Sequence, residues 1–507
     1  MSDGSAKLNL KLLRNFASLL MQQVSTYAII VLTFGIIARL MSFTEMGIYA
    51  TIVSTIHLIG ACANFGFKKV GIKLIASHAI YGDRVNISRI FWTLTFLSIP
   101  FIVSFAFATC YFLEKVVKGI LFSVHEKYLF ITLLLLFSFK NYLFAGLEAL
   151  QLFHLETLYY SVGFLVYRLT MIIFLLYGFG IKGVLVAWII GESLTLILTL
   201  RKVVTTYSPL SISFKYTSSI FKDAIPLFLI DSIIAGFEYG DRIASLILGS
   251  NVIAYFYIAT TSVQLLSSIY GILQSSFLPH FSEMYQLNGQ LILRSEVERI
   301  SKYIFIFVSP LFIISAALSE PILLILAPGY DNAVPIFQVL LISLWITSPL
   351  PLLQSVFIAS GRTYKMVSVM LISLFIDVTF MLYTYQHIGY MSTGLGRAVL
   401  LLLSYTLLLL FAYKDLKIAI NVSVYIKTLI SGGFCGIVTW VIWSFMKCYL
   451  LLPLYALLAL LLYTSAIRIM HLISIEDVLP IYNLVVRRKH YKLMVKLISV
   501  LTGVKLN

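Results

Sequence analysis

Charged residues are scarce in this chain. Of its 507 residues, 11% are Asp, Glu, Lys or Arg, whereas 60% are hydrophobic. Only four cysteines occur, and none has the CxxC spacing of a redox or zinc motif, so the pattern favours neither a disulfide framework nor a metal site. The sequence also lacks a P-loop, a zinc motif and a nucleophile elbow. We therefore expect no catalytic residue, no metal and no bound cofactor.

Long apolar runs separated by short polar joints make up most of the chain. About 20 apolar residues cross the hydrocarbon core of a bilayer as a helix, and the backbone must satisfy its own hydrogen bonds there. The sequence therefore predicts an all-α polytopic membrane protein of about fourteen transmembrane helices. The expected spans are 16–40, 46–67, 90–113, 128–147, 157–178, 183–200, 224–248, 252–278, 303–326, 333–358, 366–386, 394–413, 428–446 and 449–470.

The basic residues are concentrated in alternate joints. When the N-terminus is placed in the cytoplasm, 26 Lys and Arg residues fall in cytoplasmic segments and 6 fall outside. Cytoplasmic loops of membrane proteins carry such an excess, so we expect the cytoplasmic membrane as location, with both termini cytoplasmic. We expect no cleavable signal peptide, because the first apolar run is too long for one. The net charge of +16 then reflects topology and contact with membrane lipids, not a nucleic-acid partner.

A polar break at 201–223 divides two blocks of six expected spans. An even number of spans gives both blocks the same orientation, which predicts two six-helix bundles related by a pseudo-twofold axis along the membrane normal, plus two C-terminal helices. The predicted domains are an N-terminal bundle (1–200), a cytoplasmic linker (201–223), a C-terminal bundle (224–413), two additional transmembrane helices (414–470) and a basic cytoplasmic tail (471–507).

Several short motifs follow one another along the two blocks, over about residues 15–413. They are Ala38-Arg39-Leu40, Glu45-Met46-Gly47-Ile48-Tyr49, Phe65-Gly66-Phe67, Gly240-Asp241-Arg242, Phe277-Leu278-Pro279, Pro328-Gly329-Tyr330 and Ala359-Ser360-Gly361-Arg362. This ordered set resembles the Wzx-type polysaccharide-transporter flippases, which belong to the MATE-like multidrug/oligosaccharidyl-lipid/polysaccharide exporter (MOP) superfamily.

The resemblance implies a fold and a function. Members of that family have two six-helix bundles around a central cavity and move lipid-linked sugars across the cytoplasmic membrane. The expected function is therefore that of a transporter, not an enzyme: a flippase for a polyprenyl-(di)phosphate-linked oligosaccharide that works by alternating access. The expected partners are that lipid-linked sugar and polysaccharide-assembly proteins, and H⁺ or Na⁺ is the expected coupling ion.

Basic residues inside the expected spans are candidates for substrate binding, because a charge inside the bilayer is costly and usually faces a cavity or a partner. Arg168 lies mid-span near several tyrosines, and its guanidinium suits a diphosphate or an acidic sugar. The alternative is an arginine paired with an acidic neighbour. Arg39, Arg397 and Lys140 have a second explanation, since each could snorkel to a headgroup. The candidates are Arg168, Arg242, Arg39, Arg397 and Lys140.

Acidic residues cluster in the span 224–248. Asp231, Glu238 and Asp241 are the candidates for ion coupling, because a cavity-facing carboxylate can carry a proton or bind sodium. The alternative is a structural ion pair, such as Glu238 with Arg242 four residues later. Glu192 is a single acid in an apolar helix, where polar adhesion between helices is as good an explanation as function.

Three other functions compete with the flippase hypothesis. A multidrug or cation antiporter of the same superfamily would use acids and aromatic residues in its cavity. An integral-membrane glycosyltransferase or polymerase would need a sizeable loop with paired acids, which is not found. An assembly protein could recruit partners through the basic tail, Arg487 to Lys496.

Overall fold

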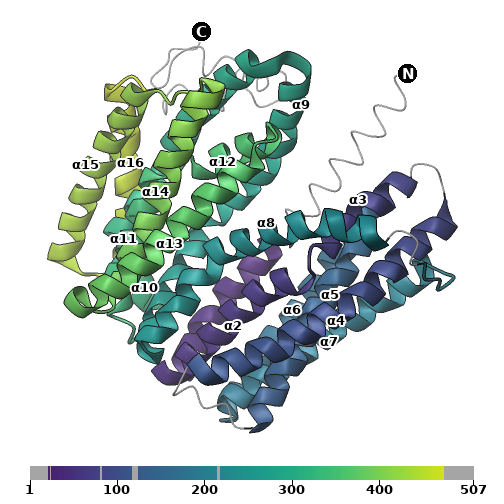
Figure 1. The fold of residues 1–507 in the computed structure, drawn as a ribbon. Helices are drawn as coiled ribbons and strands as arrows, with labels where there is room; N and C mark the ends of the chain where they lie inside the picture. Colours follow the sequence, from purple (N-terminus) through teal and green to yellow (C-terminus); the bar gives the residue numbers. More distant parts are fainter. Residues whose placement is uncertain (1–20, 23, 80–82, 117–123, 214–216, 473–507) are drawn as a thin grey trace, which may run out of the picture. The chain divides into compact units, whose positions relative to one another are not determined.

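The structure is a computed structural model that describes residues 21–22, 24–79, 83–116, 124–213 and 217–472 (Figure 1). These ranges are almost entirely helical and contain no strand, which confirms the predicted all-α class. Of the expected basic tail (471–507), all but the first two residues lie outside them. The helices are Val24–Leu40, α2 (Phe43–Ala63), α3 (Phe67–Ala79), α4 (Arg84–Val116), α5 (Val124–Ala149), α6 (Phe153–Leu176), α7 (Gly180–Thr206), α8 (Thr217–Ala244), α9 (Ser250–Ala317), α10 (Ser319–Leu326), α11 (Ala333–Ile346), α12 (Leu350–Ala359), α13 (Thr363–Ile388), α14 (Met391–Leu416), α15 (Val422–Met446) and α16 (Leu452–Ile469).

The described helices are those of a multi-pass membrane protein. Within the described ranges, 10 helices are long and apolar enough to cross a membrane, or up to 11 if α11 and α12, which meet at an angle of 51°, form one broken span. The predicted count of fourteen is therefore not confirmed. The acids of α8 lower its hydropathy, and the expected spans 252–278 and 303–326 fall largely within the single long helix α9.

Two compact units make up the described chain. The first contains the described residues up to Ile258, together with Leu326–Pro328 and Met370–Thr393. The second contains Ala259–Ile325, Gly329–Val369 and the described residues from Gly394 onward. In the first unit, α8 packs along α2 and α3. The predicted domain boundaries stay a prediction.

The start of α2 is fixed by a capping box. The Ser42 hydroxyl accepts a hydrogen bond from the Glu45 backbone N–H at 3.3 Å, and a Glu45 carboxylate oxygen accepts one from the Ser42 backbone N–H at 2.9 Å. Two N–H groups that the helix leaves without partners are satisfied in this way. The capping box therefore begins α2 sharply after the helix that ends at Leu40.

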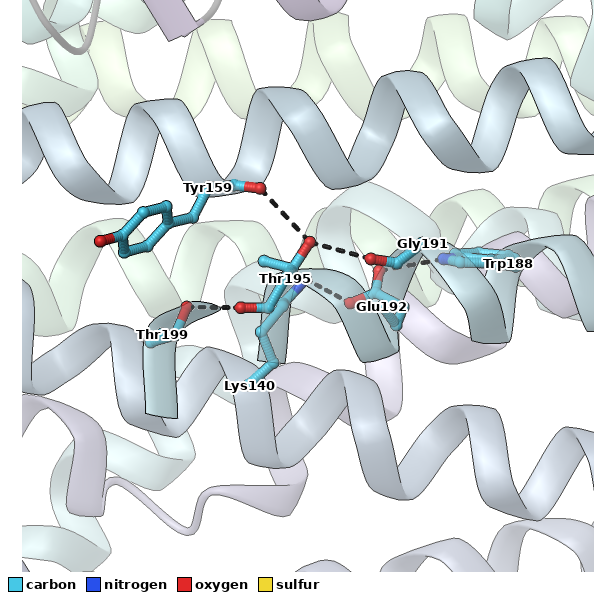
Figure 2. Close-up of polar contacts among 7 residues, drawn as sticks. All are labelled: Lys140, Tyr159, Trp188, Gly191, Glu192, Thr195 and Thr199. Atoms are coloured by element: carbon cyan, nitrogen blue, oxygen red, sulfur yellow. Dashed lines mark hydrogen bonds and ion pairs between the residues drawn. The ribbon is translucent and has the colours of Figure 1, made fainter. Parts of the chain in front are cut away.

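α6 and α7 approach each other closely through small residues. A methyl group added at Gly163 of α6 would lie 1.8 Å from Thr195 Oγ1 and 2.7 Å from the carbonyl oxygen of Gly191. The Thr195 hydroxyl donates to the Gly191 carbonyl at 3.0 Å and to the Tyr159 carbonyl at 3.4 Å (Figure 2). Small residues permit this contact between transmembrane helices, and the hydroxyl adds a hydrogen bond across it.

We expect Gly163→Val to destabilise the protein by about 1–3 kcal/mol, because the new side chain must push α6 away from α7. Thermal unfolding of the detergent-solubilised protein measures the effect. Gly433→Val is the matched control, since an added methyl group at Gly433 meets only one atom of Trp345, at 3.9 Å. Equal melting temperatures for the two variants would contradict the close packing of α6 and α7.

Candidate functional site

The first unit encloses a polar cavity of about 370 Å³ between α2, the start of α3, α5 and α8. Its wall combines polar, aromatic and small apolar residues, although the surrounding helices are mostly apolar. Its side-chain lining includes His57, Asn64, Lys68, Phe137, Asn141, Asp231, Glu238 and Tyr239. A polar cavity among membrane helices can accept a hydrated or hydroxyl-rich group that lipid would exclude.

Ion pairs tie α3 to its neighbours beside this cavity. Lys68 Nζ lies 2.6 Å from Glu148 Oε1, and Lys69 pairs with Asp231 of α8. Burial lowers the pKa of the Lys68 ammonium, but the carboxylates of Glu148, Glu156 and Asp231 together more than offset this, so the net pKa is raised. Lys68 therefore stays charged at neutral pH. Asp231, a predicted coupling acid, already has a cationic partner.

A buried ion pair joins α5 to α7 behind the cavity wall. Lys140 is only 1% exposed, and its Nζ lies 2.8 Å from Glu192 Oε2 (Figure 2). The indole N–H of Trp188 donates to the other oxygen, Glu192 Oε1, at 3.0 Å. The snorkelling explanation for Lys140 is therefore wrong, because its ammonium turns inward to a carboxylate on a neighbouring helix. For Glu192, the geometry agrees with adhesion between helices.

Arg168 lies on α6 in a different electrostatic setting. Its side chain is buried, and among the described residues neither Nε nor Nη1 has a hydrogen-bond partner. The same part of the chain offers it no carboxylate within ion-pair distance, so the alternative of an acid-paired arginine is not met there. The Phe164 and Tyr167 rings lie 5.1 and 5.4 Å from its guanidinium carbon. This cation is held by aromatic faces.

Aromatic contacts connect the two cations. The Trp188 ring stacks on Tyr167 at 5.1 Å between centroids, and the Tyr167 hydroxyl is hydrogen-bonded to that of Tyr49 at 2.9 Å. The Lys140 ammonium lies 5.5 Å from the Tyr160 ring centre. We call this group the aromatic–cationic layer; its members are Tyr49, Lys140, Tyr160, Tyr167, Arg168, Trp188 and Glu192.

The layer adjoins the cavity through Phe137 of α5. The Phe137 ring lines the cavity, and its centre lies 4.6 Å from Lys140 Nζ. His57 contacts the edge of Phe137 and stacks on Tyr239 at 5.2 Å. The Arg242 guanidinium carbon lies 5.6 Å from the Tyr239 ring centre. Lys140 and Arg242 therefore each lie against an aromatic residue of the cavity wall.

The remaining predicted residues lie elsewhere or play local roles. Arg39 is exposed, and its Nη1 donates to the Gly35 carbonyl at 3.3 Å. Asp241 is buried, and its Oδ1 accepts from the Arg242 backbone N–H at 2.7 Å. Arg397 is half-buried on α14 of the second unit. Among the three predicted coupling acids, Asp231 and Glu238 line the cavity.

Sequence reasoning missed several residues of the cavity wall. His57, Asn64 and Asn141 lie within the expected spans 46–67 and 128–147, and a search for uncharged polar groups in apolar runs would have found them. Asn64 Oδ1 is buried and has no hydrogen-bond partner among the described residues. Among all the residues that the structure describes, no three His, Cys, Asp or Glu side chains gather as they would around a metal ion.

A family model described as "Polysaccharide biosynthesis protein" matches residues 12–285, which is more than half of the chain. The chain belongs to the polysaccharide biosynthesis protein family. This confirms the predicted family resemblance. The matched region of this family member contains the whole lining of the cavity and every residue of the aromatic–cationic layer. No curated protein matches the sequence at a significant level.

Solved structures of the same architecture confirm the fold of this polysaccharide biosynthesis family member. Lipid II flippase MurJ in an inward closed conformation matches with a TM-score of 0.68 and 15% identity, over 90% of this chain and 99% of MurJ. An inward-facing multidrug resistance MATE family transporter of the MOP superfamily matches with a TM-score of 0.61 and 14% identity, over 78% and 94%. A mutant of the Vibrio cholerae MATE transporter VcmN matches with a TM-score of 0.57 and 14% identity, over 83% and 99%. The fold is therefore MATE-like.

We expect Lys140→Met to lower the free energy of unfolding by about 3–5 kcal/mol, because it leaves the Glu192 carboxylate buried without its cation. The double variant Lys140→Met/Glu192→Leu should recover most of that loss, since apolar residues can replace a buried pair. Thermal unfolding in detergent measures both. Lys69→Met is the control, because its half-exposed pair contributes at most about 1 kcal/mol. A double variant no more stable than Lys140→Met would refute the pairing.

Proposed function

We propose that the protein moves a polyprenyl-(di)phosphate-linked oligosaccharide across the cytoplasmic membrane by alternating access, with both termini in the cytoplasm. The observation that carries the proposal is the buried Arg168 guanidinium, whose Nε and Nη1 lack hydrogen-bond partners among the described residues. Burial of such groups costs free energy unless an anion or acceptor satisfies them. A phosphate group supplies oxygen acceptors and negative charge together.

The cavity supports the second part of the proposal, which concerns the saccharide. Amide, carboxylate and imidazole groups hydrogen-bond to sugar hydroxyls, and the wall offers Asn64, Asn141, Glu238 and His57. The lipid tail stays in the bilayer while the head group occupies the cavity. Membership of a polysaccharide biosynthesis family agrees with such a substrate. Transport of this kind needs no covalent chemistry, so the proposed protein is a transporter and not an enzyme.

Transport should depend on Arg168. In liposomes that contain the purified protein and a polyprenyl-diphosphate oligosaccharide, Arg168→Ala should lower the rate at which the head group reaches a lectin on the far leaflet. We expect about a tenfold loss, the equivalent of one charge-assisted hydrogen bond of about 1.5 kcal/mol.

Arg201→Ala is the matched control, because Arg201 is an exposed arginine on α7. Arg168→Lys should restore only part of the rate, since an ammonium lacks the planar donor fork of a guanidinium. Unchanged transport by Arg168→Ala at normal expression would remove this residue from the substrate site.

Ion coupling, if it uses H⁺ or Na⁺, should depend on Glu238. Both Glu238 and Asp231 line the cavity, but Glu238 is exposed whereas Asp231 is half-buried, so Glu238 is more accessible to an ion from water. We expect Glu238→Gln to abolish the stimulation of transport by a proton or sodium gradient and to spare the gradient-independent rate. Asp231→Asn should reduce that stimulation less. Full stimulation in Glu238→Gln would place the coupling elsewhere.

A cation or multidrug antiporter of the same superfamily is the second candidate function. The observation in its favour is the presence of the Asp231 and Glu238 carboxylates among aromatic residues of the cavity wall. Cations bind both to carboxylates and to aromatic faces. Exchange of a cationic dye for protons in the same liposomes, without exposure of the oligosaccharide, would favour this function.

A further inference from the structure

The aromatic–cationic layer contains two cationic side chains, Lys140 and Arg168, but only one carboxylate, Glu192. The Lys140 ammonium and the Glu192 carboxylate neutralise each other at 2.8 Å, while the layer contains no second carboxylate for Arg168. The layer therefore presents one net positive charge rather than two. The Lys140 ammonium attracts an anionic ligand strongly only when the Glu192 carboxylate has moved away from it.

The Glu192 carboxylate is held as a bound anion would be. One oxygen accepts from the Trp188 indole N–H at 3.0 Å, and the other contacts the Lys140 ammonium. The rings of Phe137, Phe144 and Tyr160 lie 4.6, 5.6 and 5.5 Å from the same ammonium. An indole donor, an ammonium and aromatic walls would suit a phosphate oxygen equally well if the carboxylate moved away.

The cavity gives a route by which a ligand could reach this place. Phe137 is both a wall residue of the cavity and a neighbour of the ammonium, so its ring separates the cavity from Lys140. A group in the cavity that displaced this ring would approach the Lys140 ammonium. Buried ion pairs contribute little net stability compared with apolar residues of the same shape, so stability alone does not explain why this pair is present.

We propose that Glu192 is the resident counterion of Lys140 and that the diphosphate of the lipid-linked substrate displaces it from the ammonium. Lys140 then becomes the second cation, after Arg168, that contacts the substrate. This second contact distinguishes a diphosphate from a monophosphate. This deepens the proposed function and rests on it. Glu192 is a specificity-determining residue that does not itself bind substrate.

The first test uses the variant Lys140→Met/Glu192→Leu, which replaces the pair by apolar side chains and is expected to fold. Binding of geranylgeranyl diphosphate and of geranylgeranyl monophosphate to the purified full chain is measured by calorimetry. The wild type should prefer the diphosphate, and the variant should lose about tenfold of that preference, the equivalent of about 1.4 kcal/mol. An unchanged preference would mean that the pair only holds α5 to α7.

The second test uses the matched control Lys365→Met/Asp415→Leu, which removes an ion pair between α13 and α14 in the second unit. This control should keep the preference of the wild type for the diphosphate. An equal loss of preference in the control and in Lys140→Met/Glu192→Leu would overturn the proposal.

The results separate this inference from the proposed function. If the wild type binds neither lipid phosphate, both the proposed function and the role of Glu192 are wrong. If the wild type binds the diphosphate through Arg168, but the variant Lys140→Met/Glu192→Leu keeps its preference, only the role of Glu192 is wrong. A fall in preference in this variant, with no fall in the control, would support both.

Discussion

Charged and polar side chains inside apolar helices must find partners within the protein, because the hydrocarbon core of a bilayer offers none. The Lys140–Glu192 pair shows how this constraint shapes the first unit. The pair fixes α5 against α7, the Trp188 indole orients the carboxylate, and Tyr167 stacks on that indole. Each group in this series depends on the one before it, so the ion pair and the aromatic contacts position one another.

Arg168 does not meet this requirement, because its Nε and Nη1 have no hydrogen-bond partner among the described residues. The helix that carries it is held tightly to α7 where Gly163 meets Gly191 and Thr195, so its backbone has little freedom to move the guanidinium to another partner. The aromatic faces around it compensate for only part of the lost hydration. A buried cation kept in this state is costly for stability alone, and it is readily understood if an anionic substrate satisfies it during transport.

The fold class could be predicted from the sequence, but the partners of the charged side chains within the spans could not. Apolar runs predicted an all-α membrane protein, because bilayer thickness and the absence of water act on every span alike. The MATE-like arrangement was implied by the family resemblance of the ordered motifs. The number of spans was less predictable, since the acids of α8 lower its hydropathy and α9 continues through two expected spans. Arg168 and Lys140 stood out as charges within apolar spans, but the partner of Lys140 lies on another helix. Lys140 and Glu192 are 52 positions apart, and only helix packing brings them together.

The most direct test of the account is a cryo-EM structure of the full chain with a polyprenyl-diphosphate oligosaccharide bound. The account predicts density for the diphosphate against the Arg168 guanidinium and the Lys140 ammonium, with the Glu192 carboxylate turned away and the sugar beside Asn64 and Asn141. A head group bound away from the aromatic–cationic layer, with Glu192 still paired to Lys140, would contradict it.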